Sequence, residues 1–194
     1  ALLAERDPMR GAPVDLSLRM DALAGKRTAA APHAPTLARI KAEAKRLGRM
    51  TKADGPDALG VLAALAYPDR LGLRRKGDAP RYVLSGGKGA VLPEADPMAG
   101  ARLLVATDLD GDPREARIRQ AALITDAELR ATFADQIHWQ DVCTWSRREG
   151  RVLTRQQEVF DALVLEDRTW PDAPAEAVAV AMLDGVRQLG LKPG

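Results

Sequence analysis

Hydrophobic residues in the first third of the chain recur at the spacing of α-helices. Residues 1–24 are expected to be helical and to end at Gly25, a residue type that is common at helix C-termini. A second helix is predicted over residues 34–50, with an apolar stripe made by Leu37, Ile40, Ala44 and Leu47. A third helix is predicted over residues 58–66, where nearly every residue is apolar, so it is expected to be buried, with Asp57 as its N-cap.

From residue 71 onward, the pattern changes to short runs of β-branched and other apolar residues separated by Gly, Asp and Pro turns. These runs predict strands at residues 71–76, 81–85, 89–92, 102–109, 115–123, 137–147 and 151–167. A short helix is predicted over residues 126–134, and a final helix over residues 173–189 ends at Gly190. The inward face of the final helix is expected to consist of Ala177, Val178, Ala181, Met182 and Val186.

The order of these elements predicts an α+β fold, because helices and strands occupy separate parts of the chain. N-terminal helices come first. A run of short strands interrupted by one helix then suits an OB-like antiparallel β-barrel. Further strands and a C-terminal helix follow the barrel.

Composition narrows the function classes without choosing one. An apolar fraction of 46% is enough for a buried core, and a net charge of +2 says little about partners. No apolar run reaches the roughly 18 residues of a membrane-spanning helix, so no membrane partner is expected. Cys143 is the single cysteine, which excludes an internal disulfide and indicates a reducing, cytoplasmic location. The chain begins at Ala1 with residues typical of a domain interior, so a fragment of a longer protein is expected.

Basic residues are concentrated in two places. One group lies on the polar face of the predicted helix 34–50 and consists of Arg39, Lys41, Lys45, Arg46 and Arg49, all but Lys41 being predicted phosphate contacts. The other group lies on the first predicted strands and their turn and consists of Arg70, Arg74, Arg75, Lys76, Arg81 and Lys88, of which Arg74, Arg75, Arg81 and Lys88 are predicted phosphate contacts. Clusters of this kind contact nucleic-acid phosphates, although a solvated helix face has the same pattern. Aromatic residues for base stacking are few, so recognition is expected to depend on phosphates and to be sensitive to salt.

A glycine-rich turn, Ser85-Gly86-Gly87-Lys88-Gly89, follows the second predicted strand. A nucleotide-binding P-loop is disfavoured, because a strand-like segment follows and no hydroxyl residue comes directly after Lys88. The turn is interpreted as a β-hairpin turn. A second interpretation is that the backbone N–H groups at Gly86 and Gly87, together with the lysine, contact a nucleic-acid phosphate.

The sequence assembles no catalytic or metal site. His138, Asp141 and Cys143 could be drawn together as a nucleophilic site, but strand residues five apart point to opposite faces. One cysteine and two distant histidines also lack the ligand spacing of a zinc site. The aspartates within residues 108–112 indicate a tight turn, because a calcium loop needs glycine at its sixth position and glutamate at its twelfth.

Several segments together resemble bacterial DEAH-type ATP-dependent helicases of the HrpB group. They are residues 3–11, 15–19, 64–71, 82–90, 108–111, 116–122, 163–165 and 181–191. Their number and order extend over essentially the whole chain. The resemblance is to the helical domain behind the helicase motor and to the C-terminal region that follows it.

This resemblance implies a piece of a larger machine, whose two RecA-like motor domains bind and hydrolyse ATP with Mg²⁺. It implies that residues 1–52 end the helical ratchet domain, residues 53–124 form the OB-like barrel and residues 125–194 form a C-terminal extension. The chain lacks the phosphate loop and the Asp-Glu-Ala-His motif of the motor. We therefore expect no cofactor in this fragment, and no catalytic residue of the motor has a counterpart here.

The favoured hypothesis is an accessory module that holds single-stranded RNA or DNA by its phosphates and closes the nucleic-acid channel beside the motor domains. The alternative is a regulatory or docking module that holds the motor domains or a partner protein. Exposure of Trp145, Trp170 or Leu191 would favour docking. A free-standing enzyme has little support. One structural feature distinguishes the two leading hypotheses, namely whether the two basic groups face the same side. The sequence leaves this open.

Overall fold

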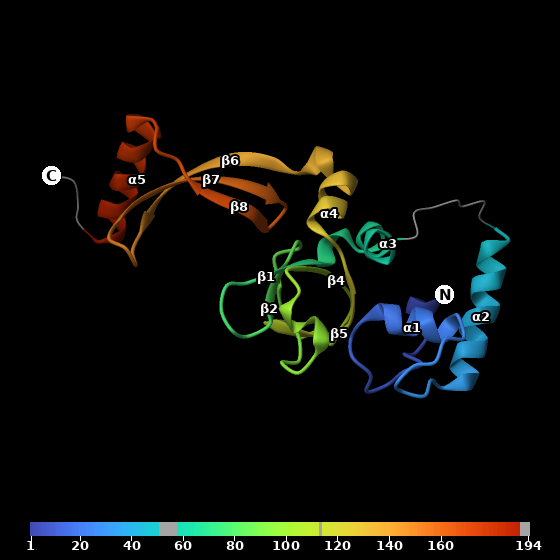
Figure 1. Ribbon diagram of the computed structural model, residues 1–194. Helices are drawn as coiled ribbons and strands as arrows, with labels where there is room; N and C mark the ends of the chain where they lie inside the picture. Colours follow the sequence, from blue (N-terminus) through green and yellow to red (C-terminus); the bar gives the residue numbers. More distant parts are fainter. Residues whose placement is uncertain (51–57, 113, 191–194) are drawn as a thin grey trace. The chain divides into compact units, whose positions relative to one another are not determined.

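The computed structural model describes residues 1–50, 58–112 and 114–190. Its contacts divide the chain into two compact units, Ala1–Thr132 and Phe133–Gly194 (Figure 1). The predicted division after residues 52 and 124 stays a prediction, and the predicted cap Asp57 lies outside the described residues. Across the described part of the chain, no helix has the length and apolar character needed to cross a membrane.

Two helices and an irregular loop form the N-terminal part of the first unit. Helix α1 spans Leu16–Leu23, and helix α2 spans Ala34–Gly48, close to the predicted bounds of the second helix. The prediction of a helix over residues 1–24 was wrong for the residues that precede α1, of which only the 3₁₀ turn Leu2–Ala4 is helical. Two prolines and Gly11, whose φ is +78°, interrupt the chain between that turn and α1.

Five short strands close a β-barrel in the same unit. They are β1 (Leu71–Arg74), β2 (Arg81–Leu84), β3 (Gly89–Val91), β4 (Leu103–Leu109) and β5 (Glu115–Leu123). The strands pair in the order β1-β2-β3-β5-β4, and β1 closes the barrel against β4. Only β3 and β5 pair in parallel, so the barrel is mixed where a wholly antiparallel one was predicted. The predicted α+β class and the barrel itself are confirmed.

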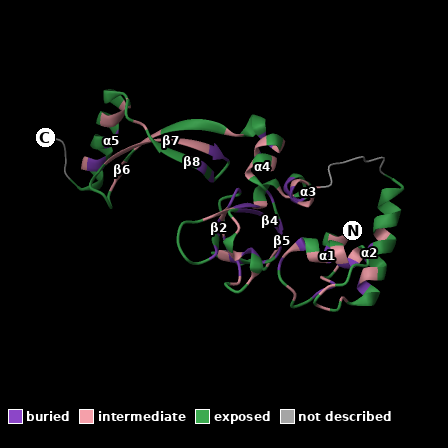
Figure 2. Cartoon of the chain, in the orientation of Figure 1, coloured by how far each residue is buried: buried purple, intermediate pink, exposed green. Residues whose placement is uncertain are grey.

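The barrel interior holds the main hydrophobic core, and Figure 2 shows buried residues concentrated along its strands. Its fully buried members include Tyr82, Leu84, Ala90, Leu104, Ala106 and Ile118. The Tyr82 hydroxyl donates a hydrogen bond of 2.8 Å to the carbonyl oxygen of Ala101. Burying this large aromatic ring is possible because its polar end is paired. A short 3₁₀ segment at Pro68–Arg70 precedes β1, and another at Pro97–Gly100 lies between β3 and β4.

Helix α3, Leu59–Ala66, packs against β4 and β5 by one face only. Gly60, Ala63 and Ala64 are buried, whereas Leu62 and Leu65 are 47% and 57% exposed. The prediction of a helix buried on all sides was therefore wrong. A helix that lies on the outside of a barrel has a single supporting surface, so its remaining apolar residues stay uncovered in this unit.

The second unit contains a three-stranded antiparallel sheet and one helix. Its elements are β6 (His138–Ser146), β7 (Arg151–Phe160), β8 (Leu163–Thr169) and α5 (Ala175–Gln188). The single strand predicted over residues 151–167 is two strands, because Asp161 adopts a φ of +47° and turns the chain. Helix α4, Asp126–Thr132, ends the first unit, and the 3₁₀ turn Ala134–Gln136 begins the second.

Helix α5 packs closely on the sheet of the second unit. Ala181 and Gly185 are buried, and a Cβ placed on Gly185 would lie 2.4 Å from the Trp145 ring. Met182 was predicted to face inward but is 49% exposed. The close approach at Gly185 rotates the helix so that its smallest residues, and not its largest, meet the sheet.

Candidate nucleic-acid interface

The basic face of α2 is partly neutralised by acids. Arg39 forms an ion pair of 3.3 Å with Glu5, and Arg46 forms one of 2.6 Å with Glu43. The hydrogen bond from Arg46 lowers the pKa of the Glu43 carboxyl. Lys45 and Arg49 are exposed. Two of the four predicted contacts on this helix therefore already have an acidic partner, which weakens the case for α2 alone as a phosphate-binding surface.

Some residues of the predicted group on the barrel also form contacts within the protein. The Arg74 side chain donates hydrogen bonds of 3.1 Å to the carbonyl oxygens of Ala99 and Asp78, so it joins loops. Arg81 forms an ion pair of 3.3 Å with Glu115, while Arg75 is exposed.

The glycine-rich turn leaves only its lysine for a ligand. The N–H of Gly86 donates to the Asp69 carbonyl and the N–H of Gly87 donates to the Leu84 carbonyl, both at 2.8 Å. Gly87 has a φ of +86°, which explains the need for glycine there. Any phosphate contact at this turn would therefore depend on the exposed Lys88.

The structure does not bring the two predicted groups together. Figure 1 shows α2 at one edge of the first unit and β1 and β2 at the other, with α1 and β5 between them. One continuous surface formed by these two groups is therefore absent from the described part of this unit.

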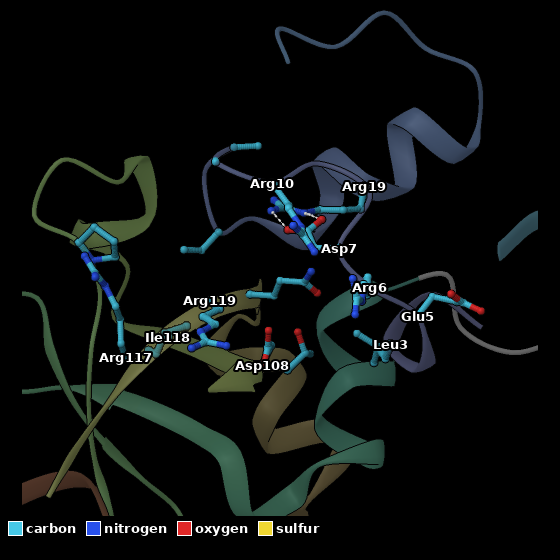
Figure 3. Close-up of a pocket in the computed structure, with 16 residues that line it drawn as sticks. Leu3, Glu5, Arg6, Asp7, Arg10, Arg19, Asp108, Arg117, Ile118 and Arg119 are labelled. Atoms are coloured by element: carbon cyan, nitrogen blue, oxygen red, sulfur yellow. Dashed lines mark hydrogen bonds and ion pairs between the residues drawn. The ribbon is translucent and has the colours of Figure 1, made fainter. Parts of the chain in front are cut away.

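A cleft lies between the N-terminal loop and strands β4 and β5 (Figure 3). Its volume is about 680 Å³. Five arginines line it: Arg6, Arg10, Arg19, Arg117 and Arg119. The acids that line it are fewer: Glu5, Asp7 and Asp108. All of these arginines except Arg19 are exposed, and no ion pair or side-chain hydrogen bond joins those four to any residue that the structure describes. We call this surface the basic cleft.

Strand alternation places two of these arginines. Residues of β5 alternate between buried and exposed, so Arg117 and Arg119 both lie on the outer face while Ile118 is buried in the barrel. The pairing of β4 with β5 is irregular at this point, and the register leaves Thr107 and Arg119 without a partner residue. Such bulges redirect side chains and are frequent beside functional sites.

A buried ion pair holds the other wall of the basic cleft. The Arg19 side chain is 1% exposed and donates to both carboxylate oxygens of Asp7, at 2.7 and 3.2 Å. It also donates to the carbonyl oxygens of Pro13 and Asp15. Burial by itself raises the pKa of Asp7, but the hydrogen bonds from Arg19 and from the Met9 N–H outweigh it, so this pKa is lowered.

Two further hydrogen bonds tie this loop to the barrel. The Val14 N–H donates to the Asp96 carboxylate at 2.9 Å, and the Ala121 N–H donates to the Val14 carbonyl at 3.0 Å. These contacts fix the loop against β5. Arg6 and Arg10 are therefore held across the basic cleft from Arg119.

A second hollow of about 590 Å³ continues the basic cleft toward α2. The two share Arg6, Asp7 and Arg10, and the second also includes His33 and Arg39. Of the residues that the sequence singled out, Arg39 is the one that adjoins this groove. The sequence could have indicated Arg117 and Arg119, because they alternate with apolar residues on a predicted strand. It could not have indicated Arg6 and Arg10, which lie in an irregular loop without any periodic spacing.

Comparison with known proteins gives a consistent result. No protein-family model matches the chain. The chain is 29% identical over 136 residues to the ATP-dependent RNA helicase HrpB of Escherichia coli K12, a match over 69% of this chain and 17% of that protein. The crystal structure of the E. coli DExH-box NTPase HrpB covers 98% of the chain, with a TM-score of 0.64 and 24% identity. The resemblance to the C-terminal region of an HrpB-type helicase is confirmed.

A second solved structure, of the E. coli DEAH/RHA helicase HrpB, covers 96% of the chain with a TM-score of 0.63 and 19% identity. The fold likeness to the HrpB structures therefore includes both units. This chain spans about one fifth of the length of those proteins, 17% of the curated sequence and 22% of each solved chain.

Proposed function

We propose that this chain is an accessory nucleic-acid-binding module of an HrpB-type ATP-dependent RNA helicase. It contacts the phosphate backbone of a single strand of RNA or DNA in the basic cleft and completes the channel beside the motor domains. The observation that carries this proposal is the cleft itself, which is lined by four exposed arginines that form no ion pair or side-chain hydrogen bond with any described residue. Backbone phosphates are the ligand that such a cluster suits, because arginine binds phosphate oxygens in a bidentate way.

The distribution of charge supports the same unit as the binding part. Residues 1–132 contain 22 Lys and Arg against 17 Asp and Glu, whereas residues 133–194 contain 7 against 10. The net charge of +2 conceals this contrast. A polyanion is therefore attracted to the first unit and repelled by the second.

In this proposal the chain binds and the rest of the helicase performs the chemistry. ATP and Mg²⁺ belong to the motor domains of the intact protein, and the fragment itself takes no cofactor. The location is cytoplasmic, as the single Cys143 suggests.

The proposal is tested by fluorescence anisotropy with the chain 1–194 and a single-stranded RNA across a salt series. Arg6→Gln combined with Arg119→Gln is expected to weaken binding about tenfold and to reduce the log–log salt slope by about 1.4, since each lost phosphate contact removes about 0.7. Arg148→Gln combined with Arg187→Gln removes the same charge from the second unit and should change neither value much. Arg81→Gln combined with Lys88→Gln tests the predicted barrel group in the same assay.

Two results would contradict the proposal. One is no binding at low salt by a chain whose circular dichroism shows that it is folded. The other is an equal loss of RNA affinity in the cleft variant and the second-unit control, which would show that only the net charge of the chain matters.

A docking function is the second candidate, favoured by exposed apolar residues on α5 and at its C-cap, Leu189. Val180 is 57% exposed, Leu183 39% and Leu189 61%. Trp145, whose exposure was expected to mark docking, is partly buried beneath α5, and Leu191 lies outside the described residues. In this function the second unit holds the motor domains or a partner protein, and the arginines of the first unit act as scaffold charges.

A further inference from the structure

The floor of the basic cleft contains a hydroxyl group without a partner. Thr107 lines the cleft and is 6% exposed, and its Oγ1 atom has no hydrogen-bond partner among the described residues. Buried hydroxyl groups are nearly always paired, because leaving one unpaired is costly. Thr107 is also the β4 residue that the bulge leaves out of register. An unpaired group at a bulge in a cleft indicates a partner that arrives with a ligand.

The neighbouring Asp108 is the second unexpected group. Its carboxylate lies among the arginines of the basic cleft, as Figure 3 shows, yet it forms no ion pair or side-chain hydrogen bond within the described structure. A carboxylate repels every phosphate that enters, so a cleft built for phosphates alone gains nothing from it. A carboxylate accepts hydrogen bonds, which a phosphodiester cannot donate.

We infer that Thr107 and Asp108 form a subsite for the sugar 2′-hydroxyl of the bound strand, so that the basic cleft selects RNA over DNA. The 2′-hydroxyl is both a donor and an acceptor, and it is the group that separates the two nucleic acids. It donates to the Asp108 carboxylate and accepts from the Thr107 hydroxyl, which turns toward the cleft by rotation about its Cα–Cβ bond between staggered positions. Deoxyribose leaves both groups unpaired. This inference rests on the proposed function, since it requires that a strand occupies the basic cleft.

The test compares 12-nucleotide oligouridine, oligodeoxyuridine and 2′-O-methyl oligouridine by anisotropy with the chain 1–194. The wild-type chain is expected to bind RNA about threefold to tenfold more tightly than DNA, which corresponds to one or two hydrogen bonds. The 2′-O-methyl strand should bind like DNA, because it has lost the donor.

Two variants test whether Asp108 and Thr107 cause the preference for RNA. Asp108→Asn should lower the RNA-to-DNA ratio, because its amide oxygen is a weaker hydrogen-bond acceptor than a carboxylate, while the loss of negative charge tightens the binding of both strands. Thr107→Val should lower the ratio about twofold to threefold without lowering the melting temperature, because it replaces an unpaired buried hydroxyl with a methyl group of the same shape. A merely structural threonine would show the opposite, with a lower melting temperature and an unchanged ratio. Asp78→Asn removes an exposed acid from the β1–β2 loop and serves as the charge control.

The outcomes separate the two proposals. Equal binding of RNA and DNA by the wild-type chain overturns this inference and leaves the proposed function standing. Binding of neither strand overturns both. An RNA preference that survives in Asp108→Asn and Thr107→Val overturns the assignment to these two residues.

Discussion

Replacing Asp7 with asparagine is expected to lower the free energy of unfolding by about 3 kcal/mol, because it leaves the charge of Arg19 buried without an acidic partner. Arg19 is 1% exposed, so water cannot replace the lost carboxylate. The Asp7 side chain is 22% exposed, which places the effect at the lower end of the range for buried pairs. Urea-induced unfolding of the two proteins at pH 7, followed by circular dichroism, measures the difference.

A matched control separates this effect from the loss of any ion pair. Asp21 pairs with Lys26 at 2.8 Å, but both side chains are largely exposed, at 41% and 66%. Asp21→Asn should therefore cost less than about 1 kcal/mol. Equal losses in the two variants would show that the Asp7–Arg19 pair is no more important than a surface contact.

The same pair has a pH dependence with a definite sign. The pKa of Asp7 is lower in the folded protein than its ordinary value, so its contribution to stability is complete above that ordinary value, near pH 4. The contribution is lost as the pH falls through the lowered folded-state pKa. The stability difference between wild type and Asp7→Asn should therefore be constant from pH 7 to about pH 5 and should shrink below pH 4. A difference that is unchanged at pH 3 would contradict this account.

Replacing Gly60 with alanine is expected to cost about 3 kcal/mol of stability. A Cβ atom at this position would lie 2.0 Å from the carbonyl oxygen of Leu123 and 2.9 Å from its carbonyl carbon. Both atoms belong to the backbone at the end of β5, so no side-chain rotation relieves the clash and α3 must move away from the barrel. Overpacking of this kind usually costs 1–3 kcal/mol, and contact with backbone places it at the upper end.

Gly48 provides the matched glycine-to-alanine control. It is exposed at the end of α2, and a Cβ there would meet nothing within 4 Å. Alanine at Gly48 should stabilise the protein by about 0.5 kcal/mol, because glycine is the poorer helix former. Thermal unfolding of the two variants should thus show shifts of opposite sign. A Gly60→Ala protein as stable as wild type would mean that α3 does not pack on β5 as described.

Local patterns were sufficient for much of the fold. The barrel strands were predicted within two residues at each end, because short runs of β-branched and other apolar residues bounded by Gly, Asp and Pro turns are a local property of the chain. Helix α2 followed from its apolar stripe in the same way. The errors fell where the decisive feature is a single backbone angle or a neighbouring surface, as at Asp161, which turns β7 into β8, and at Leu62 and Leu65 on α3.

The sequence by itself determined the α+β class, the two groups of basic residues and the likeness to the C-terminal region of HrpB-type helicases. Only the tertiary structure decided which arginines meet. Arg6 and Arg119 are far apart in the chain and line the same cleft because the Asp7–Arg19 pair and the backbone hydrogen bond from Ala121 to Val14 fix an irregular loop against β5. Such contacts join residues without any periodic spacing, so no local pattern encodes them.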